Sequence, residues 1–414
     1  MRHLFRSIFL FALVSSLVAY GHYAVAQQKT IKDPAEYNVY MAALNTDDPK
    51  QKAAAMEAFI NQYPNSVVRI DAMEQAMAAY QQAGNVAKVR DTVTRILQLD
   101  ADNIRALAIV TFLKRADATT SGDASAAKEA GLYGERGLNG LARWLKPEGL
   151  SDADFGKLKN QMAEIFYGAV GFSALQTRDY ARARQYYLKS VPLDPANLQD
   201  VYQLAVAELE ITPSDPDGFW YAAKAINLAR AQNNQAAAQG IENYGKARYR
   251  KYHGVDDGWD KIVASAGNQS EPPGDFAASI TRAPTPAELA VKAVQENEPA
   301  SLSFSDWEYV LSFRDASPAN KQAAERVWQA IQSLEKNGAA KIKIPVKVIS
   351  VGKDTIRAAI TDENQQANKA DLEITMAGPM TKPPAPGSQI QIIGILTDYK
   401  LDPFTFLMKN GELP

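Results

Sequence analysis

The sequence predicts a mostly α-helical chain, in which a solenoid of helix hairpins is followed by a small helical lead-in and a five-stranded β-barrel. Two observations support this fold class. Residues 171–197, GFSALQTRDYARARQYYLKSVPLDPAN, align without gaps with an earlier stretch, so that LDPAN at 193–197 falls on LDADN at 99–103. Self-similarity of this kind is typical of repeat proteins. After residue 341, apolar and polar residues alternate with the period of a β-strand.

The first 26 residues have the features of a secretory signal peptide. Arg2 and Arg6 supply positive charge, an apolar run extends from Ile8 to about Tyr20, and AVA at 24–26 is a small-x-small cleavage site. The apolar run is too short to cross a bilayer. We therefore expect a periplasmic or secreted protein, cleaved after Ala26, with no membrane span in the mature chain. An uncleaved N-terminal anchor is the alternative.

Composition argues against several functional classes. Without the two signal-peptide arginines, 43 basic residues remain against 47 acidic ones, a net charge of −4. No basic excess is available for nucleic acid, which is not an expected partner. The chain has no Cys, and His253 is the one histidine outside the signal peptide. A Cys/His zinc site is therefore excluded, a Ser-His-Asp triad would need His253, and no cofactor is expected.

The quoted stretch resembles the tetratricopeptide repeat, a helix-turn-helix unit. That family places a small residue on its first helix, an Ala-x3-aromatic-x2-small series on its second, and then a proline. Five residues match this pattern: Gly171, Ala183, Tyr187, Ser190 and Pro195. Ala174 departs from it, because a large aromatic residue is usual at that position. The small residues are expected where two helices approach closely, and the proline where the second helix stops.

Further units can be placed before and after this one. They span 33–66, 70–103, an irregular 104–148, 164–197, and a fifth unit from Leu198 with a short insertion at 212–216. A helix over 234–252 is expected to cap the array, because terminal repeats must be covered. The predicted solenoid therefore spans residues 30–255. A generic helical bundle is the alternative.

In such a stack the first helices line a concave groove suited to an extended peptide or a partner helix. Helical phase places eight residues in this groove: Tyr37, Met41, Glu74, Ala78, Phe172, Gln176, Tyr202 and Val206. Ordinary packing or surface exposure is the competing interpretation at each position.

Two further segments separate the solenoid from the strands. Pro and Gly interrupt any period over 256–284, which predicts a linker. A helical lead-in is predicted over 285–340. Thr285 with Glu288 forms a capping-box pattern at its start, and Ser305 with Glu308 is predicted to repeat it.

Residues 341–414 predict five strands, at KIKIPVKVISV, TIRAAIT, ADLEITM, QIQIIGILTDY and FTFLMK. Their order, with Gly394 where a barrel strand must bend, resembles the OB-fold. The loop AGPMTKPPAPGS at 377–388 departs from that family, because it is too short for the helix that often stands there. Another small β-barrel or a sandwich is the alternative.

These features favour an exported, non-enzymatic scaffold or adaptor that binds a protein or peptide partner through the concave groove. The alternative is an envelope ligand-binding protein whose C-terminal module binds a glycan or peptidoglycan fragment. The module has few aromatic residues for stacking, namely Tyr399, Phe404 and Phe406. No nucleophile elbow, P-loop or dinucleotide fingerprint is present. A carboxylate-only glycosidase is the enzymatic alternative, because paired acids are not visible in a sequence. Nothing in the pattern indicates an oligomeric state.

Overall fold

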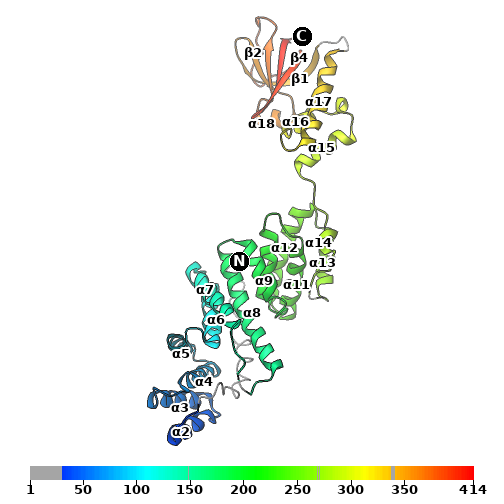
Figure 1. The fold of residues 1–414 in the computed structure, drawn as a ribbon. Coiled ribbons are helices and arrows are strands. Elements are labelled where there is room, and N and C mark those ends of the chain that lie inside the picture. The colour runs from blue at the N-terminus through cyan, green and yellow to red at the C-terminus, as the bar shows by residue number, and fades with distance from the viewer. Residues whose placement is uncertain (1–29, 148, 268, 270, 337–340) are drawn as a thin grey trace. The chain divides into compact units, whose positions relative to one another are not determined.

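The structure is a computed structural model that describes residues 30–147, 149–267, 269, 271–336 and 341–414. The predicted signal peptide lies outside these ranges. The chain divides after Arg282 into two compact units. Both parts of the predicted fold class are present, because the first unit is helical and the second ends in a closed five-stranded barrel (Figure 1).

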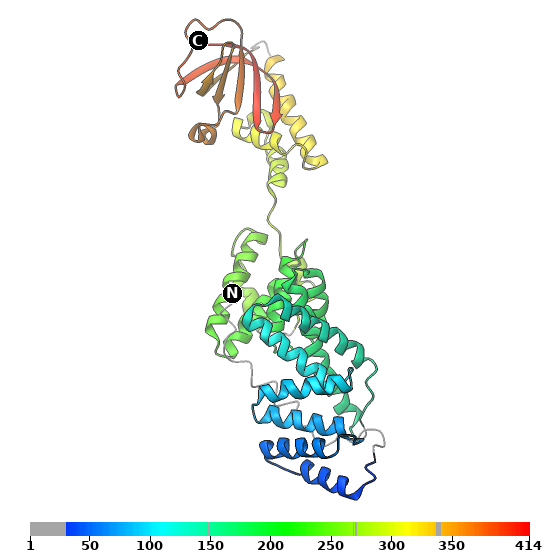
Figure 2. The same ribbon diagram turned by 90° about the vertical axis from the view of Figure 1, so that its left-hand side faces the viewer.

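The first unit is a succession of helices in which each member from α2 to α12 contacts the next along the chain (Figure 2). In addition α6 contacts α8, and α8 contacts α10, so alternate helices lie side by side. The helices are α2 Pro34–Leu44, α3 Pro49–Gln62, α4 Arg69–Gln82, α5 Val86–Leu99, α6 Ile104–Ser121, α7 Ala124–Leu141, α8 Asp152–Gln176, α9 Tyr180–Ser190, α10 Leu198–Glu210, α11 Asp217–Ala231, α12 Gln235–His253, α13 Trp259–Ala266 and α14 Phe276–Ser279.

Most of these helices begin at an Asp, Asn or Ser whose side chain accepts a hydrogen bond from the first turn. The asparagines of the two related motifs show why the pattern recurs. Asn103 Oδ1 accepts from Ala106 N at 3.0 Å, and Asn197 Oδ1 accepts from Asp200 N at 3.1 Å. Each motif therefore ends one hairpin and caps the first helix of the next.

Glycines on α7 allow this helix to lie very close to α8. Gly131, Gly134 and Gly137 recur every three residues and are buried. A Cβ at Gly137 would lie 2.2 Å from the Phe166 ring, and one at Gly131 would lie 2.5 Å from Ser173 Cβ. A side chain at these positions would collide with α8, so the glycines of α7 are explained by the close packing of the two helices.

The helical unit continues beyond residue 255, into the range predicted as a linker. Helix α13 packs on α11, and its Trp259 is fully buried. Further on, the Phe276 ring lies 5.2 Å from the ring of Trp220 on α11. The eight residues of α13 are too few to display a helical period between glycines and prolines. For that reason the composition resembles a linker, although the segment is part of the core.

The second unit combines the helical lead-in and the barrel. It contains α15 Pro286–Glu296, the 3-10 turn η1 Pro299–Ser301, α16 Phe304–Ser312, α17 Pro318–Lys336, β1 Ile342–Val351, β2 Thr355–Ala359, α18 Asp362–Ala367, β3 Leu372–Met376, β4 Gln389–Leu401 and β5 Phe404–Glu412. The strands close in the order β1-β2-β3-β5-β4. Only the β3–β5 pair is parallel. This is the OB-like barrel expected from the strand pattern.

One hydrophobic core runs through both parts of this unit. It joins Val310 of α16 and Val327 of α17 to barrel residues such as Ile344 and Phe406. The alternation in the sequence accounts for the barrel side, since Ile344, Val346 and Val348 are buried. The lead-in helices and the barrel therefore share a single hydrophobic core.

Two local features differ from the sequence prediction. The capping box at Thr285 and Glu288 forms as expected, but the second one uses Ser303 with Asp306 instead of Ser305 with Glu308. Glu308 faces Asn364 instead, and the Asn364 Nδ2 atom lies 3.3 Å from both of its carboxylate oxygens. The short helix α18, which contains Asn364, was not predicted, because six residues carry no clear period.

Candidate functional site

The candidate surface is formed by the first helix of each hairpin, α2, α4, α6, α8, α10 and α12, which we call the first-helix row. Side chains link successive members of this row. Arg105 on α6 donates to Glu74 on α4 at 2.7 Å. The ring of Tyr202 on α10 meets that of Tyr244 on α12 edge-on, with centroids 6.0 Å apart. These contacts show that the first helices share one side of the stack.

The four predicted groove residues on α2 and α4 lie in different environments. Tyr37 is 50 % exposed, whereas Met41 is partly buried against the core formed by α2 to α6. Ala78 is partly buried. The carboxylate of Glu74 accepts from both Arg105 and Asn103, each at 2.7 Å. Glu74 therefore joins two first helices, and Tyr37 offers the most accessible side chain of this group.

The four predicted groove residues on α8 and α10 divide in the same way. Gln176 is exposed and Val206 is partly buried. Phe172 and Tyr202 expose only 3 % and 7 % of their surface. Burial, together with Glu210, raises the pKa of Tyr202 to about 12. Most of the surface of these two aromatic residues is buried between helices, so little of that surface is available to a partner.

A buried ion pair beneath this surface was not anticipated. Arg115 on α6 pairs with Asp200 on α10, and the side chain of Asp200 is completely buried. The Arg115 guanidinium carbon also lies 5.6 Å from the centre of the Phe172 ring. Ser190 on α9 donates to Asp200 at 2.5 Å. Buried charges of this kind are tolerated only when they are paired and hydrogen-bonded.

Glu164 of α8 lies next to this pair. Its Oε1 atom accepts a hydrogen bond from Asn197 Nδ2 at 2.7 Å. Burial, together with the charge of Asp200, raises the pKa of Glu164 to about 7. The signal for this cluster in the sequence was weak, because an acidic residue in the first turn of a helix, such as Asp200, is ordinarily explained by the helix dipole.

A second buried carboxylate lies one hairpin further on. Glu208 of α10 is 1 % exposed and lies 3.3 Å from Arg184 Nε. Arg184 also donates to Asp215 at 2.7 Å. Burial, together with Asp215, raises the pKa of Glu208 to about 8. Both clusters join neighbouring helices through the ion pairs and hydrogen bonds of their buried carboxylates.

The aromatic residues of the barrel are engaged within their own unit. Tyr399 lies between Trp328 of α17, at 5.0 Å, and Phe404, at 5.8 Å between ring centroids. Phe404 in turn lies 4.9 Å from Phe406, and Arg314 donates to the Tyr399 hydroxyl at 3.2 Å. Phe404 and Phe406 lie in the core of this unit, and Tyr399 packs against it.

Among the residues that the structure describes, no group of three or more His, Cys, Asp or Glu side chains is arranged to hold a metal ion. Within the same ranges no helix is both long and apolar enough to span a membrane. Comparison of the chain with protein-family models and with curated proteins gives no match.

Proposed function

We propose that this protein is an exported, non-enzymatic scaffold that binds a protein or peptide partner along the first-helix row. The observation that supports this most directly is the continuity of the row. Glu74 and Arg105 link α4 to α6, Arg115 links α6 to α10, and Tyr202 contacts α12. A row of helices held in register in this way presents an extended surface, which is how helical repeat proteins bind partners.

The packing of the fourth hairpin supports the resemblance to the tetratricopeptide repeat. A Cβ at Gly171 on α8 would lie 3.0 Å from the Tyr187 ring on α9. Ala183, Tyr187 and Ser190 are all essentially buried. The small and aromatic residues of the motif therefore meet each other, as the helix-hairpin packing of that family requires.

Export is inferred from the signal peptide alone. It is tested by expressing the full chain in a bacterial host, fractionating the cells and sequencing the N-terminus of the product. We expect the protein outside the cytoplasm with Gln27 as its first residue. A product that stays in the cytoplasm and begins at Met1 would refute this part of the proposal.

The binding surface is tested by site-specific photo-cross-linking in the native cells. A photoreactive amino acid replaces Tyr37 or Gln176, which are exposed on first helices, or Leu132 and Leu188, which are exposed on the second helices α7 and α9. We expect the same cross-linked protein from both first-helix positions and none from the controls. Equal cross-linking from the second helices would move the site to the other side of the stack.

A further inference from the structure

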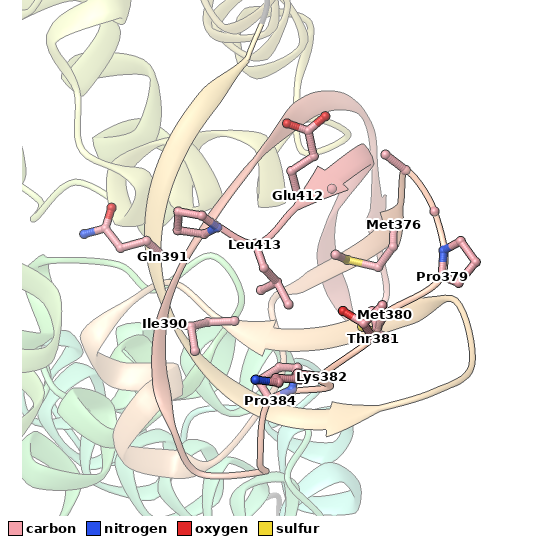
Figure 3. Close-up of a pocket in the computed structure, with 14 residues that line it drawn as sticks. Met376, Pro379, Met380, Thr381, Lys382, Pro384, Ile390, Gln391, Glu412 and Leu413 are labelled. Atoms are coloured by element: carbon pink, nitrogen blue, oxygen red, sulfur yellow. The ribbon is translucent and has the colours of Figure 1, made fainter.

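The second unit contains a cavity that the scaffold proposal does not use. Its volume is about 700 Å³, and it opens where β3 ends and β4 begins (Figure 3). The loop over 377–384 forms one wall, Ile390 and Gln391 of β4 form another, and residues 411–414 complete it. OB-folds commonly bind ligands on the face of strands 2 and 3, flanked by the β1–β2 and β4–β5 loops. This cavity lies elsewhere on the barrel.

One part of the cavity wall is apolar. Met376, Met380, Ile390 and Leu413 line it, together with prolines of the loop. Figure 3 shows the side chains of Met376, Ile390 and Leu413 turned towards the same hollow. Methionine is flexible and polarisable, so a wall containing two of them adapts to different apolar groups. This part of the cavity suits one aliphatic side chain of a ligand.

The rest of the wall is polar and exposed to solvent, at Thr381, Lys382 and Gln391. Glu412 is the one carboxylate side chain in the lining, and it is paired with Lys341. Lys382 is the one cationic side chain in the lining and is exposed, which favours a ligand that carries negative charge.

We propose that this cavity binds a short acidic peptide segment, with one aliphatic side chain in the hollow and a carboxylate at Lys382. Thr381 and Gln391 supply both donors and acceptors, which the backbone of an extended peptide needs and a fatty acyl chain would leave unpaired. No aromatic residue lines the cavity, so it has no surface on which a sugar ring stacks. The site is thus a second peptide-binding position, independent of the first-helix row.

Methionine methyl NMR of the mature full-length chain tests this proposal at the site itself. The signals of Met376 and Met380 are assigned by substituting each with leucine. The probe is acetyl-Glu-Leu-Glu-amide, with acetyl-Gln-Leu-Gln-amide and acetyl-Glu-Gly-Glu-amide as matched peptides. We expect Glu-Leu-Glu to shift both signals with millimolar affinity, and each matched peptide to bind several-fold more weakly.

The lysine is tested in the same titration. Lys382→Ala should weaken Glu-Leu-Glu binding about two- to fivefold, the effect of an exposed ion pair. Lys353→Ala, which removes an exposed lysine in the β1–β2 turn, should leave it unchanged. Failure of all peptides to move the two signals would overturn the proposal. So would equal binding of Glu-Leu-Glu and Gln-Leu-Gln, or shifts caused by decanoate but not by the peptides.

Discussion

Asn197 holds two helices of the first unit at once. Its Oδ1 atom caps α10, while its Nδ2 atom donates to Glu164 on α8 at 2.7 Å. Asn103 does the same two hairpins earlier in the chain, where it caps α6 and donates to Glu74 on α4 at 2.7 Å. The asparagine that recurs in the sequence therefore fixes the start of a first helix and its distance from the preceding one.

Replacing Asn197 with alanine should cost more stability than the loss of a helix cap alone. We expect Asn197→Ala to lower the free energy of unfolding by about 2 kcal/mol, roughly half from the cap and half from the hydrogen bond to Glu164. Asn234→Ala, which removes a cap bond to Ala237 on α12, is the matched control and should cost about 1 kcal/mol. Urea denaturation followed by circular dichroism measures both, and equal losses would contradict the dual role.

The raised pKa of Glu164 predicts that stability falls as the pH rises. The folded chain keeps the proton up to about pH 7, whereas the unfolded chain releases it near 4.5. Between these values the folded state binds more protons, so its stability decreases with pH and then levels off. At about 1.4 kcal/mol per pKa unit, the change amounts to roughly 3 kcal/mol.

Glu164→Gln tests this assignment, because glutamine keeps an oxygen for Asn197 and cannot ionise. The variant should be more stable than the parent at pH 8 and similar to it at about pH 5. Glu129→Gln, which removes a carboxylate from a partly exposed ion pair with Lys114, should change stability by at most about 1 kcal/mol. Parallel pH curves for Glu164→Gln and the parent would show that Glu164 is not the titrating group.

The contact between α7 and α8 gives a third prediction. Gly137→Ala places a methyl group 2.2 Å from the Phe166 ring, so the helices must separate. We expect a loss of about 1–3 kcal/mol in the free energy of unfolding. Gly156 on α8 has nothing within 4 Å of its would-be Cβ, and Gly156→Ala should stabilise the chain by about 0.5–1 kcal/mol. Thermal denaturation distinguishes these opposite signs. A Gly156→Ala variant that is also destabilised would show that the Cβ contacts at these glycines do not explain the effect.

The shared core of the second unit predicts that the barrel depends on its helices. A fragment of residues 283–414 should unfold cooperatively, because it retains the contacts of Val310 and Val327 with the barrel. A fragment of residues 341–414 loses these contacts and the Trp328–Tyr399 pair, and should melt at a lower temperature or without a sharp transition. Equal melting temperatures by circular dichroism would show that the barrel folds independently.

The candidate surface was only partly accessible to sequence reasoning. Helical phase places a residue on one side of its helix, and of the eight predicted groove residues Tyr37 and Gln176 are exposed. It does not say how closely neighbouring helices approach. This distance decides whether Phe172 and Tyr202 face a partner or pack against other helices, and both are buried in helix contacts. The cavity near Lys382 was equally out of reach, since residues from β3, β4, β5 and a loop line it.

The sequence by itself determined the features that depend on near neighbours in the chain. Asp, Asn and Ser set the helix starts, the repeated motif placed Asn103 and Asn197, and alternation located all five strands. Only the tertiary structure decided that Asp200 and Glu164 are buried, and that α13 belongs to the first core. Burial depends on which distant elements remove water from a side chain, and that information is not carried by periodicity or capping.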